Sequence, residues 1–173
     1  MTGTRRSPRR WHHIAIAGGA AAVMVAGSTV IAYAPGPVDP CHVNGTTYCV
    51  LNPAVTQATI KTTICVSGYT KTIRPAVAFT DALKRTQMTA QHLPGTPADY
   101  EEDHRMPLEL GGAPSDPKNL APESRSGVTP ASLKDSAENA AKQKVCAGAD
   151  LRKTQAEFVK TWLGPYPDRK SVV

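Results

Sequence analysis

The residues best suited to chemistry lie in one stretch, DYEEDHRMPLELGGAPSDPKNLAPE, at positions 99–123. It places Asp103 directly before His104, with Asn119 further along. Histidine suits the role of a general base because its unperturbed pKa lies near neutral pH. Carboxylate and amide oxygens are ligands that Mg²⁺ accepts. The stretch is therefore either a small catalytic site with a base, a metal ligand and a positioning amide, or an acidic surface loop that contains a histidine.

The segment around His104 must bring neighbouring side chains to one place. We expect an extended segment over 100–110, broken by the Gly-Gly pair and the prolines that follow. Successive side chains of an ideal strand point to opposite faces, so Asp103 and His104 share a site only if the strand twists or ends there. Pro107, three residues after the histidine, favours such an end.

Two helices are expected after this segment. Residues 130–148 carry an apolar stripe at i, i+4 spacing, and Gly148 ends the pattern. Asp150 is a typical cap for a second helix, which Gly164-Pro165 closes.

The region before the site is expected to combine short strands with one helix. CHVNGTTYC (41–49) is typical of a tight hairpin around Asn-Gly. KTTICVSGYTKTIRP (61–75), rich in Thr, Ile and Val, predicts one bent strand or two short ones. Residues 79–92 predict a helix with Asp81 or Thr80 as its cap. Short strands followed by C-terminal helices indicate a small α+β domain.

The first 34 residues predict an export signal or an N-terminal membrane anchor. Four arginines and no acid precede an uncharged apolar run over 14–34, which is long enough to span a bilayer as a helix. Ala32-Tyr33-Ala34 is typical of a cleavage site, although Pro35 disfavours cutting there, and Val30-Ile31-Ala32 is the second choice. We expect a protein that is secreted or, if uncleaved, held at the outer face of the cytoplasmic membrane through residues 14–34.

Net charge alone gives little support for a polyanionic partner. The chain is +6 overall, but four of its 20 Lys and Arg residues precede position 35 and all 14 acids follow it. The exported part therefore carries 16 basic against 14 acidic residues. Any case for nucleic acid must rest on a local site. Several scattered cationic residues could contact phosphates, but such residues are normally just solvent-exposed: Lys71, Arg74, Lys84, Arg85 and Arg105.

The four cysteines all lie on the exported side of the leader, where thiols oxidise. Four cysteines allow three pairings. We favour Cys41–Cys49, which closes a short loop, and Cys65–Cys146, which ties an early strand to a late helix. A zinc site is the competing interpretation, disfavoured because the spacings contain no C-x-x-C pair and no nearby pair of histidines.

The stretch around His104 resembles the HNH endonucleases, part of the larger group of His-Me finger or ββα-metal nucleases, and is most similar to small secreted actinobacterial proteins of that kind. The resemblance is sharpest over residues 99–123 and looser on either side. The matching residues are Asp103-His104, Pro107, Gly111-Gly112 and Asp116-Pro117-Lys118-Asn119-Leu120. It implies a ββα-metal core and phosphodiester hydrolysis assisted by Mg²⁺ or another divalent cation.

The resemblance also implies a role for each matching residue. His104 would be the general base, Asp103 a metal ligand, and Asn119 the residue that holds the hairpin and orients His104. The HNH pattern ends with a further histidine ligand, but no histidine follows His104 in this chain. The replacement would come from the helix at 130–148. Asn139 is the first choice, because related His-Me finger nucleases use an asparagine on this helix, and Glu138 is the second.

We therefore expect an exported, metal-dependent nuclease acting on DNA or RNA. Its HNH-like domain would cover 61–164, after a linker and cysteine-closed hairpin at 35–60 and before a loose tail at 165–173. The competing interpretation is a noncatalytic extracellular structural or binding domain on a degenerate HNH-like scaffold. In the enzyme, His104 and the ligands converge on one open cleft. In the alternative they diverge, or His104 is buried against a satisfied partner.

Overall fold

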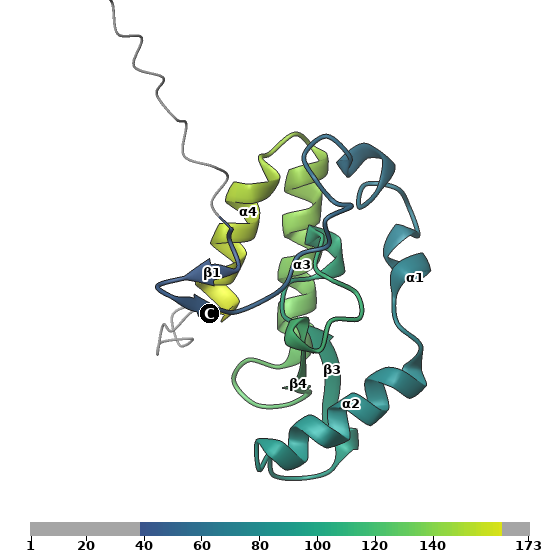
Figure 1. Cartoon of the computed structure of the whole chain (residues 1–173), viewed down its shortest axis with the longest axis vertical. Helices are drawn as coiled ribbons and strands as arrows, with labels where there is room; N and C mark the ends of the chain where they lie inside the picture. Colours follow the sequence, from purple (N-terminus) through teal and green to yellow (C-terminus); the bar gives the residue numbers. More distant parts are fainter. Residues whose placement is uncertain (1–38, 164–173) are drawn as a thin grey trace, which may run out of the picture. The chain divides into compact units, whose positions relative to one another are not determined.

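The computed structural model describes residues 39–163, which form an α+β fold of small sheets and helices (Figure 1). The strands are β1 (His42–Val43), β2 (Thr46–Thr47), β3 (Tyr100–His104) and β4 (Leu120–Ser124), and the helices are α1 (Tyr69–Ile73), α2 (Val77–Ala90), α3 (Ala131–Cys146) and α4 (Leu151–Phe158). The expected leader at 1–34 and tail at 165–173 lie outside the described residues. Among residues 39–163, no helix is long and apolar enough to cross a membrane.

Two antiparallel hairpins provide the strands. In the first, β1 pairs with β2 around Asn44 and Gly45, whose φ angles of 50° and 79° belong to the left-handed region. Asparagine and glycine tolerate that region best, so the Asn-Gly signal correctly predicted this turn. In the second, β3 pairs with β4 in a register that sets His104 opposite Leu120. A long loop, 105–119, connects these two strands.

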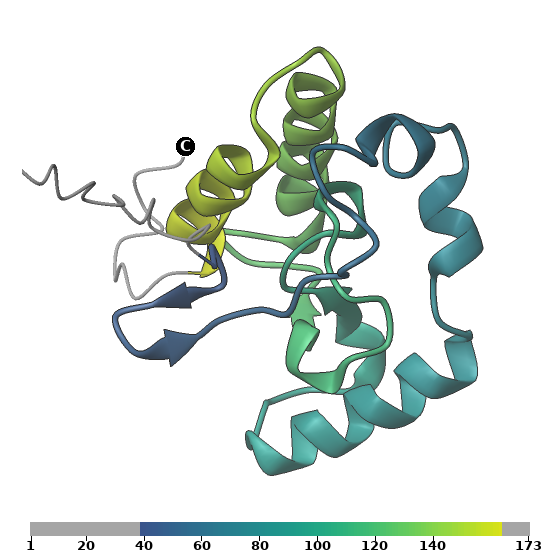
Figure 2. The same cartoon turned by 45° about the horizontal axis from the view of Figure 1, so that its top comes forward.

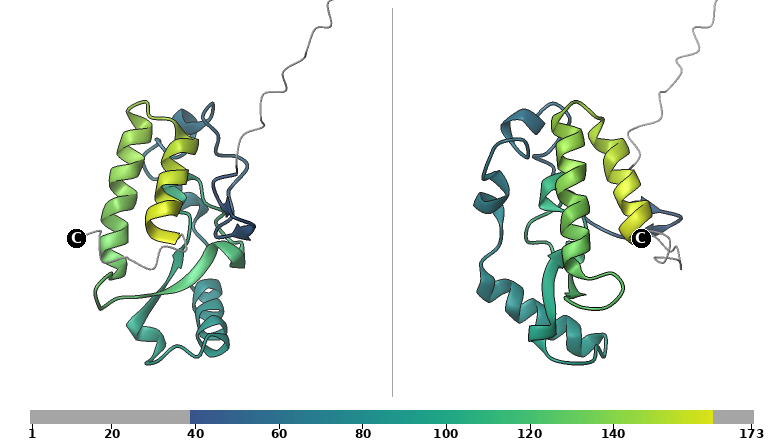
Figure 3. Two further views of the ribbon diagram at one scale, coloured as in Figure 1. Left: turned by 90° about the vertical axis from the view of Figure 1, so that its left-hand side faces the viewer. Right: turned by 180° about the vertical axis from the view of Figure 1, so that it is seen from behind.

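The β3–β4 hairpin lies between two helices, one on each side (Figure 3). On one side α2 packs against both strands, and its Lys84 donates to the main-chain oxygen of Tyr100 at 3.2 Å. On the other side α3 reaches the hairpin through Lys134, which pairs with Asp103. Because strand side chains alternate between faces, neighbouring residues of β3 contact different helices.

The apolar core lies where α3 and α4 meet the 105–119 loop (Figure 2). Its members are almost completely buried and come from residues 41–64, from the 105–119 loop and from the C-terminal helices; they include Ile64, Met106, Leu110, Val145, Leu151, Phe158 and Trp162. Both expected disulfides are present, Cys41–Cys49 within this core and Cys65–Cys146 at the end of α3. The predicted pairing is confirmed. A domain with few aromatic residues gains stability from such covalent links.

The prediction of strands over 61–75 was wrong. This segment instead forms a 3₁₀ turn at Ile60–Thr62 and the short helix α1. No neighbouring strand among the described residues pairs with it, and strand propensity depends on such pairing. Its threonine hydroxyls bind carbonyls of the preceding turn instead, as when Thr63 donates to the Thr59 oxygen at 2.7 Å.

Two boundaries also differ from the sequence-based expectations. Helix α2 begins at Val77 after Pro75, so Thr80 and Asp81 lie inside the helix and neither caps it. The extended segment expected over 100–110 ends at His104, and residues Leu108–Leu110 form a 3₁₀ turn. The loop turns there because its main chain bonds to itself and to Asn119 rather than to a partner strand. By contrast, α3 and α4 confirm the two predicted C-terminal helices, and Asp150 accepts a hydrogen bond from Lys153 N as expected for a cap.

Candidate functional site

His104 is the last residue of β3, and only 3% of it is exposed. Its Nε2 lies 2.9 Å from the main-chain oxygen of Pro114. A carbonyl oxygen can only accept, so Nε2 carries the proton and Nδ1 carries the lone pair when the ring is neutral. Within residues 39–163, Nδ1 has no hydrogen-bond partner. The ring is thus held in the tautomer that leaves one basic nitrogen unused.

The surroundings of His104 keep its ring neutral. Burial lowers the pKa of His104 below its ordinary value, because a charged ring would lose its hydration. The Pro114 carbonyl and the Asp103 carboxylate act in the opposite direction, while the positive charges of Arg74 and Lys134 lower the pKa further. At neutral pH the ring is therefore uncharged and able to accept a proton.

Asn119 is fully buried and holds the loop that follows His104. Its Oδ1 accepts from the main-chain nitrogen of Met106 at 2.9 Å and from that of Val50 at 3.3 Å. Its Nδ2 donates to the oxygens of Met106 at 3.0 Å and Ala113 at 2.9 Å. Ala113 is next to Pro114, whose carbonyl holds His104. The amide therefore connects both ends of the loop and positions the residue that orients the histidine.

Gly112 allows this close packing. A Cβ at this position would lie 1.8 Å from the Met106 oxygen and 2.8 Å from Asn119 Nδ2. Such distances are far below van der Waals contact, so no other residue fits without displacing the loop. One glycine of the pair is thus required by its neighbours.

The other, Gly111, has a φ of 80°. Its α-hydrogen faces Val55, whose side chain would lie 2.7 Å from a Cβ. The Gly-Gly motif noted in the sequence therefore serves both a left-handed turn and a close approach.

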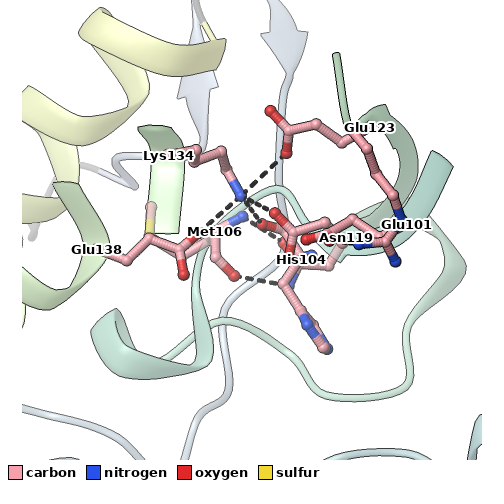
Figure 4. Close-up of polar contacts among 9 residues, drawn as sticks. Glu101, His104, Met106, Asn119, Glu123, Lys134 and Glu138 are labelled. Atoms are coloured by element: carbon pink, nitrogen blue, oxygen red, sulfur yellow. Dashed lines mark hydrogen bonds and ion pairs between the residues drawn. The ribbon is translucent and has the colours of Figure 1, made fainter. Parts of the chain in front are cut away.

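Lys134 reaches from α3 into a group of carboxylates (Figure 4). Its ammonium forms a short contact with Asp103 Oδ2, lies 2.7 Å from Glu138 Oε1 and 3.5 Å from Glu123 Oε2, and donates to the His104 main-chain oxygen at 2.9 Å. The side chain is only 4% exposed. We refer to Asp103, Glu123 and Glu138 together as the carboxylate trio, and Lys134 is the cation at its centre.

The charges of the carboxylate trio are unequal. Burial opposes ionisation of Asp103, but the Lys134 ammonium and further hydrogen bonds hold the pKa of Asp103 below its ordinary value. Burial raises the pKa of Glu123 to about 7 and that of Glu138 to about 8, more than Lys134 lowers them. Burial disfavours the charged form of Lys134 too, yet the three carboxylates together raise its pKa. The ammonium and Asp103 are therefore charged at neutral pH, and the two glutamates hold protons part of the time.

The structure brings together only some of the predicted site residues. Asp103 and Glu138 meet at Lys134, whereas Asn139 is exposed and its Nδ2 donates to the main-chain oxygen of Asp135 at 3.0 Å. Residues four apart on a helix share a face, and Asn139, one position after Glu138, is rotated by about 100° away from it. The imidazole of His104 points away from the Lys134 ammonium, consistent with the alternation along β3 (Figure 4).

Sequence reasoning overlooked Lys134 and Glu123. Lys134 stands four residues before Glu138 on the predicted helix, a spacing that signals an ion pair. Glu123 is two residues from the partner of Asp103 in β4, on the same face of the hairpin. Both signals become readable only once the ends of β3, β4 and α3 are known to meet.

The residues beside Asp103 do not fit the divalent cation that the resemblance implies. Lysine has three donor hydrogens, and those of Lys134 are taken by Asp103, Glu138 and the His104 oxygen. A second cation among the same oxygens would meet the ammonium at close range. In the described part of the chain, no group of three or more His, Cys, Asp or Glu side chains is arranged to hold a metal ion.

A cavity of about 170 Å³ opens beside the carboxylate trio, lined by Asp103, Glu123, Lys134, Arg105 and Trp162 among others. The Arg105 guanidinium forms no hydrogen bond or ion pair with any residue in 39–163. The trio therefore borders an open cavity.

No protein-family model, curated protein or solved structure matches this chain.

Proposed function

We propose that this domain is an exported nuclease-type hydrolase that cleaves phosphodiester bonds, with Nδ1 of His104 as the general base. The observation that carries the proposal is the bond from Nε2 to the Pro114 carbonyl, which leaves Nδ1 with a lone pair and no partner among residues 39–163. A pKa below the ordinary value keeps that lone pair free at neutral pH.

The local architecture supports the same proposal. The resemblance implies a ββα-metal core, with His104 as the base and Asn119 as the residue that holds the hairpin. In this chain His104 ends β3, Asn119 precedes β4, and α3 follows. The four hydrogen bonds of Asn119 give it a positioning role rather than a catalytic one.

In the proposed reaction His104 Nδ1 takes a proton from water. The oxygen of that water bonds to phosphorus, the bond to the ester oxygen breaks, and the leaving oxygen takes a proton from solvent. Arg74 is exposed, and its positive charge acts on His104, so it is suited to neutralise the phosphate as the base works. No step passes through a divalent cation, because Lys134 holds the place beside Asp103.

A second candidate is a noncatalytic extracellular domain that keeps this scaffold for structure or partner binding. The burial of His104, 3% exposed, favours it. So does the position of the imidazole, which faces away from the carboxylate trio instead of converging with it (Figure 4). In this candidate the histidine is a structural member of the loop, held by Pro114.

The test incubates the oxidised full-length chain with supercoiled plasmid and with single-stranded RNA, in Mg²⁺, in Mn²⁺ and in EDTA. His104→Ala is the active-site variant, and His42→Ala, which changes an exposed histidine of the first hairpin, is its matched control. Cleavage by wild type and by His42→Ala that disappears in His104→Ala supports the hydrolase. No cleavage of either polymer by folded protein favours the second candidate. Cleavage that stops in EDTA would show that the reaction requires a divalent ion.

A further inference from the structure

We propose that Lys134 is the resident cation of the carboxylate trio, taking the place that a divalent metal ion would otherwise occupy between the hairpin and α3. This inference concerns charge and binding, and it stands whether or not His104 catalyses hydrolysis. It assigns the trio a function in holding β3, β4 and α3 together without an external ion.

The geometry of the ammonium carries the inference. Its neighbours are carboxylates from all three elements: Asp103 of β3, Glu123 of β4 and Glu138 of α3. A main-chain oxygen, that of His104, completes the shell at 2.9 Å. Oxygen atoms are also the ligands that Mg²⁺ and Ca²⁺ accept. The ammonium satisfies them with one positive charge.

The burial and hydrogen bonding of Lys134 explain why its ammonium stays bound to the trio. Lys134 is 4% exposed, and all three of its donor hydrogens are used. Breaking a buried ion pair by removing one partner leaves an uncompensated charge and is strongly destabilising. The trio therefore needs a cation as long as Asp103 is ionised, and the lysine is covalently attached.

Among the described residues, the three carboxylates are not arranged to hold a metal ion. We expect that removing the lysine lets their oxygens close around one. In Lys134→Ala the trio keeps its oxygens, loses its cation, and stays connected to solvent through the cavity beside it. Lys134→Met, which removes the charge but fills most of the space, separates the two effects. Lys134→Ala/Glu138→Gln removes one carboxylate and is the matched control for ligation.

The experiment measures Mn²⁺ binding to the oxidised full-length chain by electron paramagnetic resonance, together with the midpoint of thermal unfolding in Mn²⁺ and in EDTA. We expect Lys134→Ala to bind Mn²⁺ at least about tenfold more tightly than wild type, since its carboxylates lack a counter-charge. Its midpoint should rise in Mn²⁺, while that of wild type stays the same. Lys134→Met and the double variant should both bind less tightly than Lys134→Ala.

Two results would overturn the inference. One is Mn²⁺ binding by wild type that Glu138→Gln abolishes, because the trio would then hold a metal with the lysine present. The other is folded Lys134→Ala that binds no more Mn²⁺ than wild type. If Lys134→Ala is unfolded in EDTA, it is refolded in Mn²⁺: recovery of the native near-ultraviolet circular dichroism supports the inference, and failure to recover it counts against it. None of these readouts depends on nuclease activity, so failure of the proposed function remains a separate result.

Discussion

At the scale of single residues, the order of the site depends on one buried amide. The side-chain oxygen of Asn119 accepts a hydrogen bond from the main-chain nitrogen of Met106. Its side-chain nitrogen donates to the main-chain oxygens of Met106 and Ala113. An aspartate could not donate to the two carbonyls, and a leucine of similar size would leave all these groups unpaired. The amide explains why the loop after His104 turns back on itself instead of continuing the strand.

Replacing Asn119 by alanine is therefore expected to lower the free energy of unfolding by roughly 2–4 kcal/mol, because several buried polar groups lose their partners. Urea unfolding of the oxidised protein measures this change. Asn139→Ala is the control: its side chain is exposed and makes one bond within α3, and we expect a change within about 0.5 kcal/mol. Equal effects of the two substitutions would show that the loop does not depend on the amide.

Gly112→Ala tests the close approach in the same loop. The added Cβ would meet the Met106 oxygen at 1.8 Å, which forces the main chain apart. We expect a loss of stability of about 3 kcal/mol or more, together with chemical-shift changes at Met106 and Asn119 in nuclear magnetic resonance spectra. A variant with unchanged stability would mean that the loop has a second, wider conformation.

At the scale of elements, the contact between α3 and the hairpin is electrostatic as well as apolar. Burial raises the pKa of Glu138 to about 8 and of Glu123 to about 7, and both bind a proton more tightly in the folded than in the unfolded chain. Their contribution to stability is complete below the ordinary value of 4.5 and is lost as the pH rises through about 7 and 8. Glu102, whose pKa burial also raises to about 7, acts in the same direction.

The free energy of unfolding is therefore expected to fall between pH 6.5 and 8.5, by roughly 1 kcal/mol per pH unit. The lowered pKa of His104 has the opposite effect, because stability lost at low pH is regained as the pH rises to 6.5, the ordinary value. The range for this measurement therefore begins at pH 6.5. Urea unfolding at intervals of pH gives the slope. Glu138→Gln should flatten it, whereas Glu157→Gln, on the exposed side of α4, should leave it unchanged. An identical slope in wild type and Glu138→Gln would remove Glu138 from this account.

At the scale of the whole molecule, the two disulfides constrain very different lengths of chain. Cys41–Cys49 spans a sequence separation of 8, and Cys65–Cys146 one of 81. The longer link ties the segment before α1 to the end of α3, so every element that positions His104 lies between its two ends. In the loop-entropy model, the link that closes the longer loop restricts the unfolded chain more.

Removing Cys65–Cys146 by two alanine substitutions is accordingly expected to cost about 2 kcal/mol more than removing Cys41–Cys49, from loop entropy alone. Thermal and urea unfolding of the two double variants compare them directly. The opposite order would indicate that packing of the fully buried Cys41–Cys49 sulfurs outweighs chain entropy.

The sequence by itself determined the features that depend on near neighbours. The Asn-Gly turn, the helices α3 and α4, the Asp150 cap and the α+β class follow from turn chemistry, i, i+4 spacing and capping, which act within a few residues. The disulfide pairing was also predictable, because four cysteines allow only three pairings.

Only the tertiary structure decided how distant residues meet. The segment 61–75 has the composition of a strand but finds no partner strand, so local hydrogen bonds determine its conformation. Glu138 lies on the face of α3 that meets the hairpin, and Asn139 is exposed to solvent. Lys134 lies on the same face as Glu138 and is surrounded by the carboxylates. Burial and charge pairing depend on the sum of contacts from elements far apart in the chain. For that reason some residues of the site could be named as candidates from the sequence, while Lys134, Glu123 and the surroundings of His104 could not.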